Sequence, residues 1–397
     1  MQTQPAKPNL ILLLILALLV IFCPMAIDIY LPAFPTIATQ FNVTEQQVQQ
    51  TVAIFMLTVG LGQLIAGPLA DKFGRKPVAV VGVSLYSGSA LLAYMAPSFA
   101  VLMFARALQG LGACATFVVA FAIVRDKYGS ERSGQMITYL NGIVCFIPAL
   151  APILGAWLTV QFGWRMNFMF LTLFALAGLV IPLTLFRETR PADSHYQGHI
   201  LDLRRFVPIL KTPIFLFNSL LCMVAMSAIL VYVTLAPGWI ITHLGGSVAD
   251  FTFWFTLNAV LSIVASFITP IYIKRNSQKA LRVGVTVLVA SGILMIALSH
   301  IESAIALMLP ILIAALGFAL SLGSAAGMAL SRFPNQAGTA SALIGAMQMS
   351  GASVLVFLTQ YLGLSTPWLI AFHLLLLAPL WLILMSKKAH TLHPVNT

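Results

Sequence analysis

Asp28 and Arg106 are the only charged residues that lie deep within the long apolar stretches of this 397-residue chain. A charged side chain at the centre of a bilayer costs roughly 2.5–3.5 kcal/mol on insertion scales, so it is seldom present without a partner or a function. A carboxylate can bind and release a proton, and a guanidinium can pair with it. The two residues therefore predict a polar site inside a helical bundle.

The elements that must position this site are membrane-spanning helices. The chain is 60% hydrophobic and 8% charged, whereas soluble domains are about 25% charged. Its apolar stretches are about 20 residues long, which is the length that a helix needs to cross a bilayer. Strands of a β-barrel would be about half as long and would alternate in polarity. We expect an all-α integral membrane protein that is not an enzyme.

Twelve such stretches follow one another, each with boundaries uncertain by about three residues. The first follows Lys7 and resembles a signal peptide over residues 10–22, but no small-residue cleavage site is evident and the apolar run continues, so we interpret it as a span. The predicted spans are 10–36, 46–69, 77–95, 98–122, 135–159, 166–186, 212–236, 250–273, 283–300, 303–329, 337–359 and 367–386.

The basic residues predict the orientation of these spans. With the N-terminus inside, all 21 Lys and Arg residues except Arg106 and Arg165 fall on the inner side. This is the positive-inside bias, and it predicts a multi-pass protein of a bacterial inner membrane with both termini in the cytoplasm. The net charge of +11 therefore reports topology, and we expect no nucleic-acid partner.

The polar segment 187–211 divides the spans six and six. We predict an N-terminal half at 1–186, a cytoplasmic linker at 187–211 and a C-terminal half at 212–397, a plan typical of transporters that bind substrate between two repeats. His195 and His199 in the linker are interpreted as solvated residues, and His373 as a core histidine bonded to a neighbour. No spacing of Cys or His predicts a metal site.

Three motifs carry more specific information. The first is GPLADKFGRKP at 67–77, a charged turn between spans 2 and 3. In span 4, ARALQGLGA at 105–113 places Arg106 ahead of Gln109, Gly110 and Gly112, and these glycines allow close helix approach. In span 5, PALAPILG at 148–155 contains Pro148, Pro152 and Gly155, which favour a kinked and closely packed helix.

These motifs resemble those of the major facilitator superfamily. Span 1 carries DIYLP at 28–32, and with GWR at 163–165 and ETR at 188–190 it is similar to the twelve-span drug:proton antiporter branch, nearest to the Bcr/CflA multidrug efflux group. The likeness is strong in the N-terminal half and rests mainly on hydropathy in the C-terminal half. The span 5 motif departs from the antiporter pattern, with Ala151 and Ala156 at two glycine positions. Val20 occupies a position where some of that group carry a second acid.

The resemblance implies roles for particular residues. The loop built on Gly67, Asp71, Gly74 and Arg75 would be a conformational latch, with Arg75 bridging to Asp126 and Asp71 meeting the start of span 11 at 338–341. Asp28 and Arg106 would couple transport to protons. A plain charged turn, an Arg106 satisfied by backbone carbonyls, a kinked packing helix in span 5, and an Asp28 that faces external water or only neutralises Arg106 remain alternatives.

Depth suggests that Asp28 and Arg106 can meet. Each lies 8 residues from the predicted outer end of its span (36 − 28 and 106 − 98), or about 12 Å at 1.5 Å per residue. A substrate pocket at this depth should be mainly apolar with a few polar groups. The candidates that would line it are Tyr30, Asn141, Phe146, Asn218, Met226, Tyr232, Trp254 and Asn258.

The resemblance implies a proton-coupled exporter of drugs or similar small lipophilic molecules, with amphenicol-type antibiotics as candidate substrates. A proton-coupled transporter of a dedicated metabolite, working by export or uptake, is the alternative. No P-loop of the form GxxxxGK[ST] is present, so we expect no cofactor and a proton gradient as the energy source. The expected partners are the substrate, protons and the bilayer, and we expect a monomer.

Overall fold

The computed structural model describes residues 10–184, 188–190, 202–333 and 336–386, and within them every long element is a helix. Eleven described helices are long and apolar enough to cross a bilayer, and a shorter apolar helix covers Arg165–Val180. The predicted all-α membrane architecture with about twelve spans is confirmed. The long helices are α1 (Leu10–Asp28), α3 (Glu45–Phe73), α4 (Arg75–Tyr94), α5 (Phe99–Phe162), α6 (Arg165–Thr184), α8 (Pro213–Pro237), α9 (Val248–Arg275), α10 (Ser277–Leu298) and α11 (Ala304–Leu330).

The first predicted span is interrupted at Asp28, the residue that the sequence analysis singled out. Helix α1 ends at Asp28, a short 3-10 helix follows at Leu31–Ala33, and α2 continues from Phe34 to Phe41. Pro32 has no backbone N–H, and its ring would clash with the carbonyl four residues earlier, which belongs to Asp28. The predicted span 10–36 is present, since Leu12–Phe41 is long and apolar enough to cross a bilayer, but it is broken after α1, so that Asp28 lies at a helix terminus.

Spans 4 and 5 are joined within one helical element, α5, rather than separated by a loop. Arg106 near its start lies over the Tyr30 ring, while Gly155 near its end packs against the Ile29 carbonyl. Both limbs of α5 therefore pass the same level of the bundle, so the chain turns back between the apolar segments Phe99–Tyr128 and Tyr139–Phe162.

The last two spans are also interrupted. The eleventh consists of α12 (Ala337–Ala346), a π-helical turn η5 (Met347–Gly351) and α13 (Ala352–Thr359). The twelfth consists of α14 (Thr366–Leu375) and α15 (Ala378–Met385). Such π-turns are frequent at functional sites, and η5 contributes to the central cavity described below.

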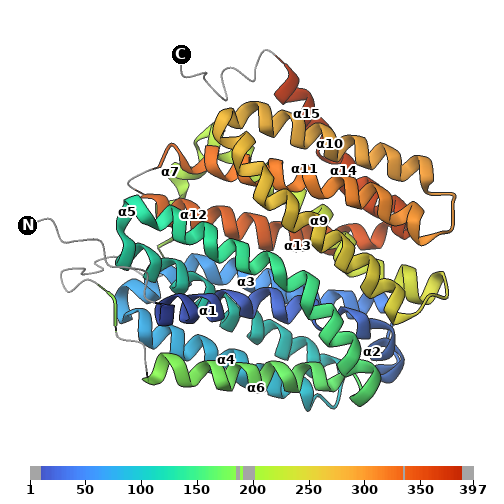
Figure 1. Ribbon diagram of the computed structural model, residues 1–397, viewed down its shortest axis with the longest axis horizontal. Helices are drawn as coiled ribbons and strands as arrows, with labels where there is room; N and C mark the ends of the chain where they lie inside the picture. Colours follow the sequence, from blue (N-terminus) through green and yellow to red (C-terminus); the bar gives the residue numbers. More distant parts are fainter. Residues whose placement is uncertain (1–9, 185–187, 191–201, 334–335, 387–397) are drawn as a thin grey trace, which may run out of the picture.

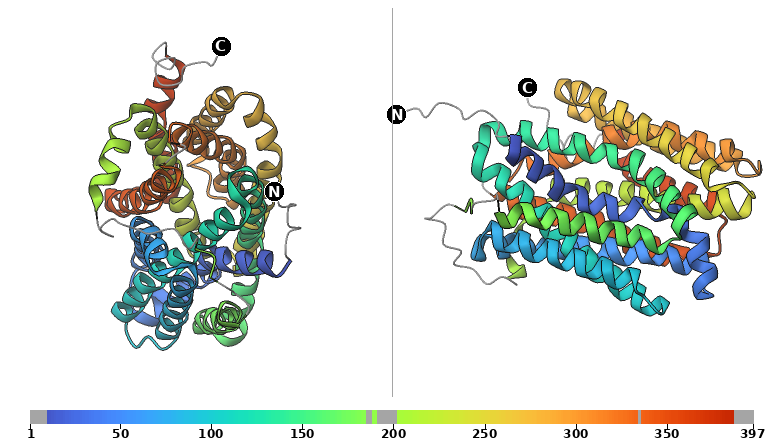
Figure 2. Two further views of the ribbon diagram at one scale, coloured as in Figure 1. Left: turned by 90° about the vertical axis from the view of Figure 1, so that its left-hand side faces the viewer. Right: turned by 60° about the horizontal axis from the view of Figure 1, so that its bottom comes forward.

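The helices form two groups along the sequence (Figure 1). Helices α1–α6 pack on one another on one side, and α8–α15 pack on one another on the other, as the end-on view also shows (Figure 2). The two groups meet where α5 lies against α9 and where α3 lies against α12, η5 and α13. Residues 187 and 191–201 of the predicted linker, which include His195 and His199, lie outside the described residues.

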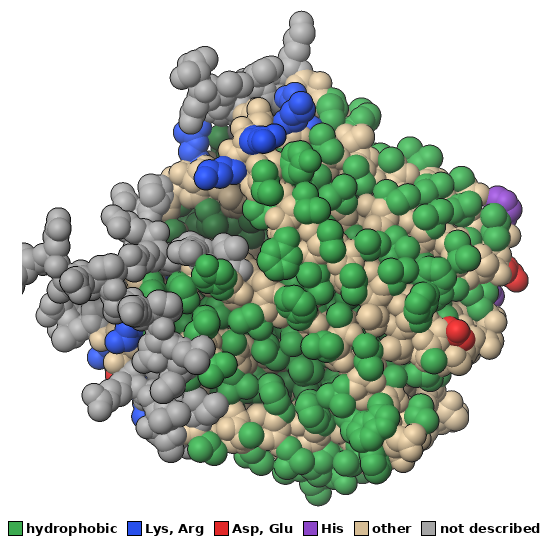
Figure 3. Space-filling model, viewed as in Figure 1, with side chains coloured by type: hydrophobic (Ala, Val, Ile, Leu, Met, Phe, Trp, Pro, Cys, Tyr) green, Lys and Arg blue, Asp and Glu red, His purple; other side chains and the backbone are tan. Residues whose placement is uncertain are grey.

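Basic side chains gather at one end of the bundle, as Figure 3 shows. We call it the basic end, defined by the described residues Lys72, Arg75, Lys76, Arg125, Lys127, Lys274, Arg275, Lys279 and Arg282, which lie where α3, α9 and the first limb of α5 end and where α4 and α10 begin. The opposite end carries Glu45, Asp250 and Glu302. The apolar belt between these ends matches a membrane-spanning orientation.

Candidate functional site

A cavity of about 630 Å³ lies between the two groups of helices. Its walls come from α1, α3, both limbs of α5, α8, α9, α11 and η5, and they are mostly apolar. Asp28 is the only charged side chain among the described lining residues. A mainly apolar cavity of this size with a few polar groups is typical of a small-molecule site.

The carboxyl group of Asp28 lies at the cavity without a bonding partner among the described residues. The break after α1 places it in the cavity wall, and its side chain is 5% exposed. Among the described residues no hydrogen bond or ion pair satisfies its carboxyl group. A buried carboxylate without a partner carries a large desolvation cost. A ligand that lies beside it can therefore change whether this carboxyl group is protonated.

Arg106 does not pair with Asp28 in this conformation, so the expected approach of the two side chains is not observed. Its guanidinium is fully buried, donates from Nε to the Thr51 carbonyl at 3.4 Å and from Nη1 to Gln109 Oε1 at 2.6 Å. It also lies 4.7 Å from the Tyr30 ring centre and 4.4 Å from that of Phe55. The alternative of an Arg106 satisfied by backbone carbonyls is met only in part, because one contact is to a carbonyl, the others are to an amide and two rings, and Nη2 has no partner among the described atoms.

Half of the predicted substrate residues line the cavity. Asn141, Met226, Tyr232 and Asn258 do so. The other four do not line it: Tyr30 is buried against Arg106, Asn218 donates to the Ile214 carbonyl within α8, and Phe146, which is exposed, and Trp254 are not part of the lining. Helical phase decides this, because neighbours along a helix point in different directions.

Other lining residues were missed by the sequence analysis. Gln63 and Gln348 bring amides from α3 and η5, and Cys23 and Cys145 bring thiols. An amide within an apolar span is a signal that could have identified the two glutamines. Phe117, Phe255 and Phe318 look like ordinary core residues in the sequence and offered no such signal.

The charged turn between α3 and α4 contains the contact that the resemblance implies. Arg75 pairs through Nη1 with Asp71 at 2.5 Å and through Nε with Asp126 at 2.9 Å. Gly74 joins the two helices with φ of 105°, a conformation that favours glycine. Asp71 contacts Arg75 and not the start of α12, where Gly338 instead lies beside the Arg125 guanidinium. A Cβ added at Gly67 would meet no atom within 4 Å, so no close contact requires a glycine there.

The ETR segment joins this network. Glu188 accepts hydrogen bonds from the backbone amides of Arg75 and Lys76 and from those of Thr189 and Arg190, all at 2.9–3.0 Å. Partial burial of Glu188 opposes ionisation, but these amides outweigh it and hold the pKa of its carboxyl group below the usual value. Glu188 thus caps the N-terminus of α4, where Gly74 has no side chain to do so.

The small residues of α5 allow close helix contact. A Cβ on Gly110 would collide with Thr58 and the Phe55 carbonyl of α3, and one on Gly112 would lie 2.6 Å from the Tyr86 backbone nitrogen of α4. A Cβ on Gly155 would collide with the Ile29 carbonyl beside Asp28. All three contacts lie within the N-terminal group, and the third is next to Asp28 in the wall of the cavity. Pro148 and Pro152 lie on the same limb as Gly155.

Known proteins of similar sequence point to the same architecture. The chain is 32% identical over 354 residues to Multidrug resistance protein MdtL of Escherichia coli O157:H7 (strain EC4115 / EHEC), covering 87% of this chain and 88% of that one. It is 33% identical over 352 residues to Multidrug resistance protein MdtL of Salmonella heidelberg (strain SL476), covering 87% of each.

Solved structures share the fold at low identity. The human organic anion transporter MFSD10 (TETRAN) aligns with a TM-score of 0.74 at 16% identity, over 96% of this chain and all of that one. A D-xylose–proton symporter aligns with a TM-score of 0.74 at 15% identity, over 95% and 96%. The family model described as Major Facilitator Superfamily matches residues 16–356. With two helix groups around a central cavity, the chain belongs to the Major Facilitator Superfamily of membrane transporters.

Proposed function

We propose that this transporter exports drugs or similar small lipophilic molecules in exchange for protons. The observation that carries the proposal is the central cavity, whose apolar walls contain one acidic side chain, Asp28. The relatives named for multidrug resistance support the substrate class. Amphenicol-type antibiotics are candidate substrates.

The proposed mechanism uses the two helix groups as rocking halves around a fixed site. When the cavity faces the cytoplasm, ionised Asp28 favours binding of the drug. When it faces outside, protonation of Asp28 releases the drug, and the proton is carried inward. One proton crossing 100 mV carries about 2.3 kcal/mol, enough to sustain a useful gradient.

The orientation follows from charge and from contacts. We place the basic end and both termini in the cytoplasm of a bacterial cell, in its inner membrane. At the opposite end, Gln46 donates to the Gln360 carbonyl at 3.0 Å and Gln360 donates to Gln49 at 3.3 Å, which joins the two groups of helices. The cavity reaches toward the basic end at Asn141 and Ser266. The described conformation then corresponds to a cavity closed to the outside. We treat the protein as a monomer.

The decisive test is transport by purified protein in proteoliposomes with an imposed pH gradient and labelled chloramphenicol. We expect gradient-driven flux in the wild type and its loss in Asp28→Asn, which keeps the shape of the side chain and removes its charge. A variant with the same thermal stability and unchanged gradient-driven flux would remove Asp28 from the mechanism.

The alternative is proton-coupled transport of one dedicated metabolite. The amides of Gln63, Asn141, Asn258 and Gln348 in the lining favour it, because several fixed hydrogen-bonding groups can recognise one polar ligand. Competition separates the two functions. Many unrelated lipophilic compounds should inhibit chloramphenicol flux in an exporter of drugs, whereas a dedicated transporter should respond to a single chemical class.

A further inference from the structure

We propose that a groove between α5 and α9 is a lateral route by which lipophilic substrates pass between the bilayer and the central cavity. This inference rests on the proposed export function and says how the exported molecule would reach or leave the cavity. The groove has a volume of about 680 Å³ and faces outward from the bundle, on the seam between the two groups of helices.

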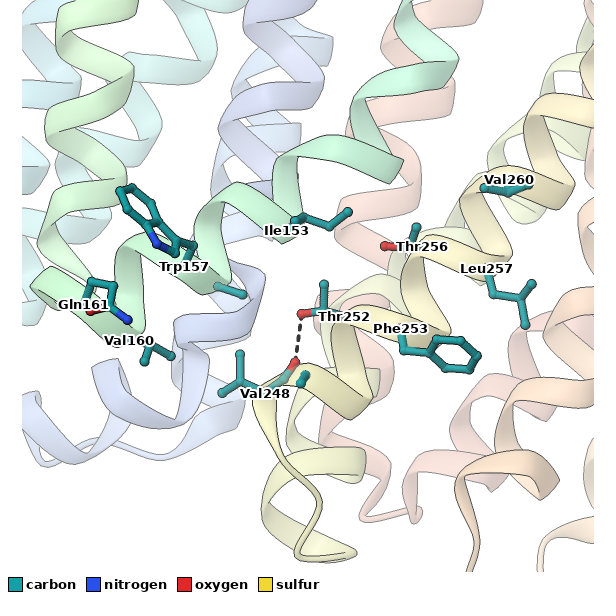
Figure 4. A pocket seen from close by; sticks show the side chains of 12 residues that line it. Ile153, Trp157, Val160, Gln161, Val248, Thr252, Phe253, Thr256, Leu257 and Val260 are labelled. Atoms are coloured by element: carbon teal, nitrogen blue, oxygen red, sulfur yellow. Dashed lines mark hydrogen bonds between the residues drawn. The ribbon is translucent and has the colours of Figure 1, made fainter.

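Its walls are apolar and exposed. Ile153, Trp157 and Val160 on α5 and Phe253 and Val260 on α9 line the groove, and in Figure 4 Ile153 and Thr256 point toward the facing helix. The five apolar side chains are 45–66% exposed. On a span of a membrane protein, such side chains contact hydrocarbon rather than water. Lipid-soluble molecules therefore have direct access to this groove.

The groove is deep enough to reach the level of the cavity. It begins at Val248, the first residue of α9, and extends to Val260. The 12 helical steps between these residues span about 18 Å, which is more than half of a hydrocarbon core of about 30 Å. Phe255, Asn258 and Ala259, on another face of the same stretch of α9, line the central cavity.

The seam of α5 and α9 lies between the two spaces, because both helices line both of them. Thr256, a groove residue, donates to the Ala149 carbonyl at the long distance of 3.5 Å. Nearer the basic end, Cys145 and Ser266 make a weak contact at 3.7 Å. Pro148 and Pro152 remove backbone donors from α5 at this level. Because the polar contacts across the seam are weak and the prolines weaken α5, we expect α5 and α9 to separate at a small cost in free energy when the two halves move.

The occupant we infer is a substrate in transit rather than a resident phospholipid. The groove lies across the junction between the halves, whose relative motion would open and close it, and it backs onto the cavity that contains Asp28. The hydroxyl groups of Thr252 and Thr256 donate to the Val248 and Ala149 carbonyls and can still accept a hydrogen bond within the apolar walls, which suits molecules that carry both apolar and polar groups.

Photolabelling tests occupancy without requiring transport. In phosphatidylcholine vesicles, the neutral probe 3-phenyl-3-(trifluoromethyl)diazirine should label the groove segments several-fold more, per exposed residue, than the lipid-facing surface of α6. Ala156→Trp fills the groove and should abolish this enrichment, whereas Ala177→Trp, on an exposed position of α6, should not. Uniform labelling, or equal enrichment of a photoactivatable phospholipid, would overturn the route.

Transport then tests passage. In a cysteine-free background, Ala149→Cys with Thr256→Cys allows oxidative closure of the seam. Closure should reduce flux of the lipophilic dye Hoechst 33342 several-fold more than flux of chloramphenicol, and reduction should restore it. Equal loss of both, or no loss, would contradict a lateral route. Absence of any flux in the open protein would instead count against the proposed function, while the labelling result would still decide whether the groove is occupied.

Discussion

Arg106 illustrates how this protein holds a charge inside a membrane. Its guanidinium is enclosed by the rings of Tyr30 and Phe55 and bonded to a carbonyl and an amide. Arg suits such a place because its planar group stacks on aromatic rings and its charge is weakly hydrated. At the scale of the residue, Arg106 in this conformation joins α5 to α3 through the Thr51 carbonyl and makes no ion pair with Asp28 among the described contacts.

Removing the amide partner of Arg106 should destabilise the protein. In Gln109→Leu, Nη1 loses its acceptor while the volume is nearly conserved, so we expect an unfolding free energy lower by about 1–3 kcal/mol. Thermal unfolding in detergent measures this. Gln161→Leu is the control, since Gln161 is exposed on the same helix. Equal melting temperatures for the two variants would show that the Arg106–Gln109 bond adds no stability.

At the scale of the element, the second limb of α5 must approach α1 closely. Gly155 permits this approach because any Cβ there would collide with the Ile29 carbonyl, and the contact holds the broken end of α1 against the cavity wall. The break itself arises from Pro32. One glycine and one proline on different helices thus position Asp28.

Two glycines of α5 provide a matched test of this contact. Gly142→Ala should be neutral or stabilising by up to about 1 kcal/mol, because alanine favours a helix and nothing lies within 4 Å of the new Cβ. Gly155→Ala should lower the melting temperature and the gradient-driven flux together. If both variants melt like the wild type, α5 and α1 do not depend on this close approach.

The capping carboxylate of α4 predicts a dependence on pH. Because the folded state holds the pKa of Glu188 below its usual value, its contribution is present above the pKa of the unfolded chain and is lost as pH falls through the folded value. Melting curves from neutral to acidic pH should show Glu188→Gln less stable at neutral pH, with the difference shrinking in acid. A constant difference across this range would indicate a role other than the ionised cap.

At the scale of the whole molecule, function depends on how the two groups of helices separate. They are joined at the opposite end by the bonds of Gln360 with Gln46 and Gln49, and by Ser353 donating to the Ala53 carbonyl at 2.5 Å. Alternating access requires these bonds to break while the contacts within each group persist.

Locking that end should stop transport without unfolding the protein. In a cysteine-free background, Gln49→Cys with Gln360→Cys treated with a reducible bis-methanethiosulfonate should lose flux, and dithiothreitol should restore it. Each single variant serves as the control for labelling alone. Full transport by the cross-linked protein would show that this end does not open.

The sequence alone determined the membrane class, the twelve apolar stretches, the bias of basic residues and the identity of Asp28 as the exceptional acid, because length, hydropathy and charge are local properties. The contact of Arg75 with Asp126 was also predicted, through a motif resemblance rather than physics. Only the tertiary structure decided which face each residue presents. It placed Asn141 and Tyr232 in the cavity but Phe146 and Tyr30 outside it, and it turned Arg106 away from Asp28. Such choices depend on the packing of helices distant in sequence, which residue types and spacing within one span do not specify.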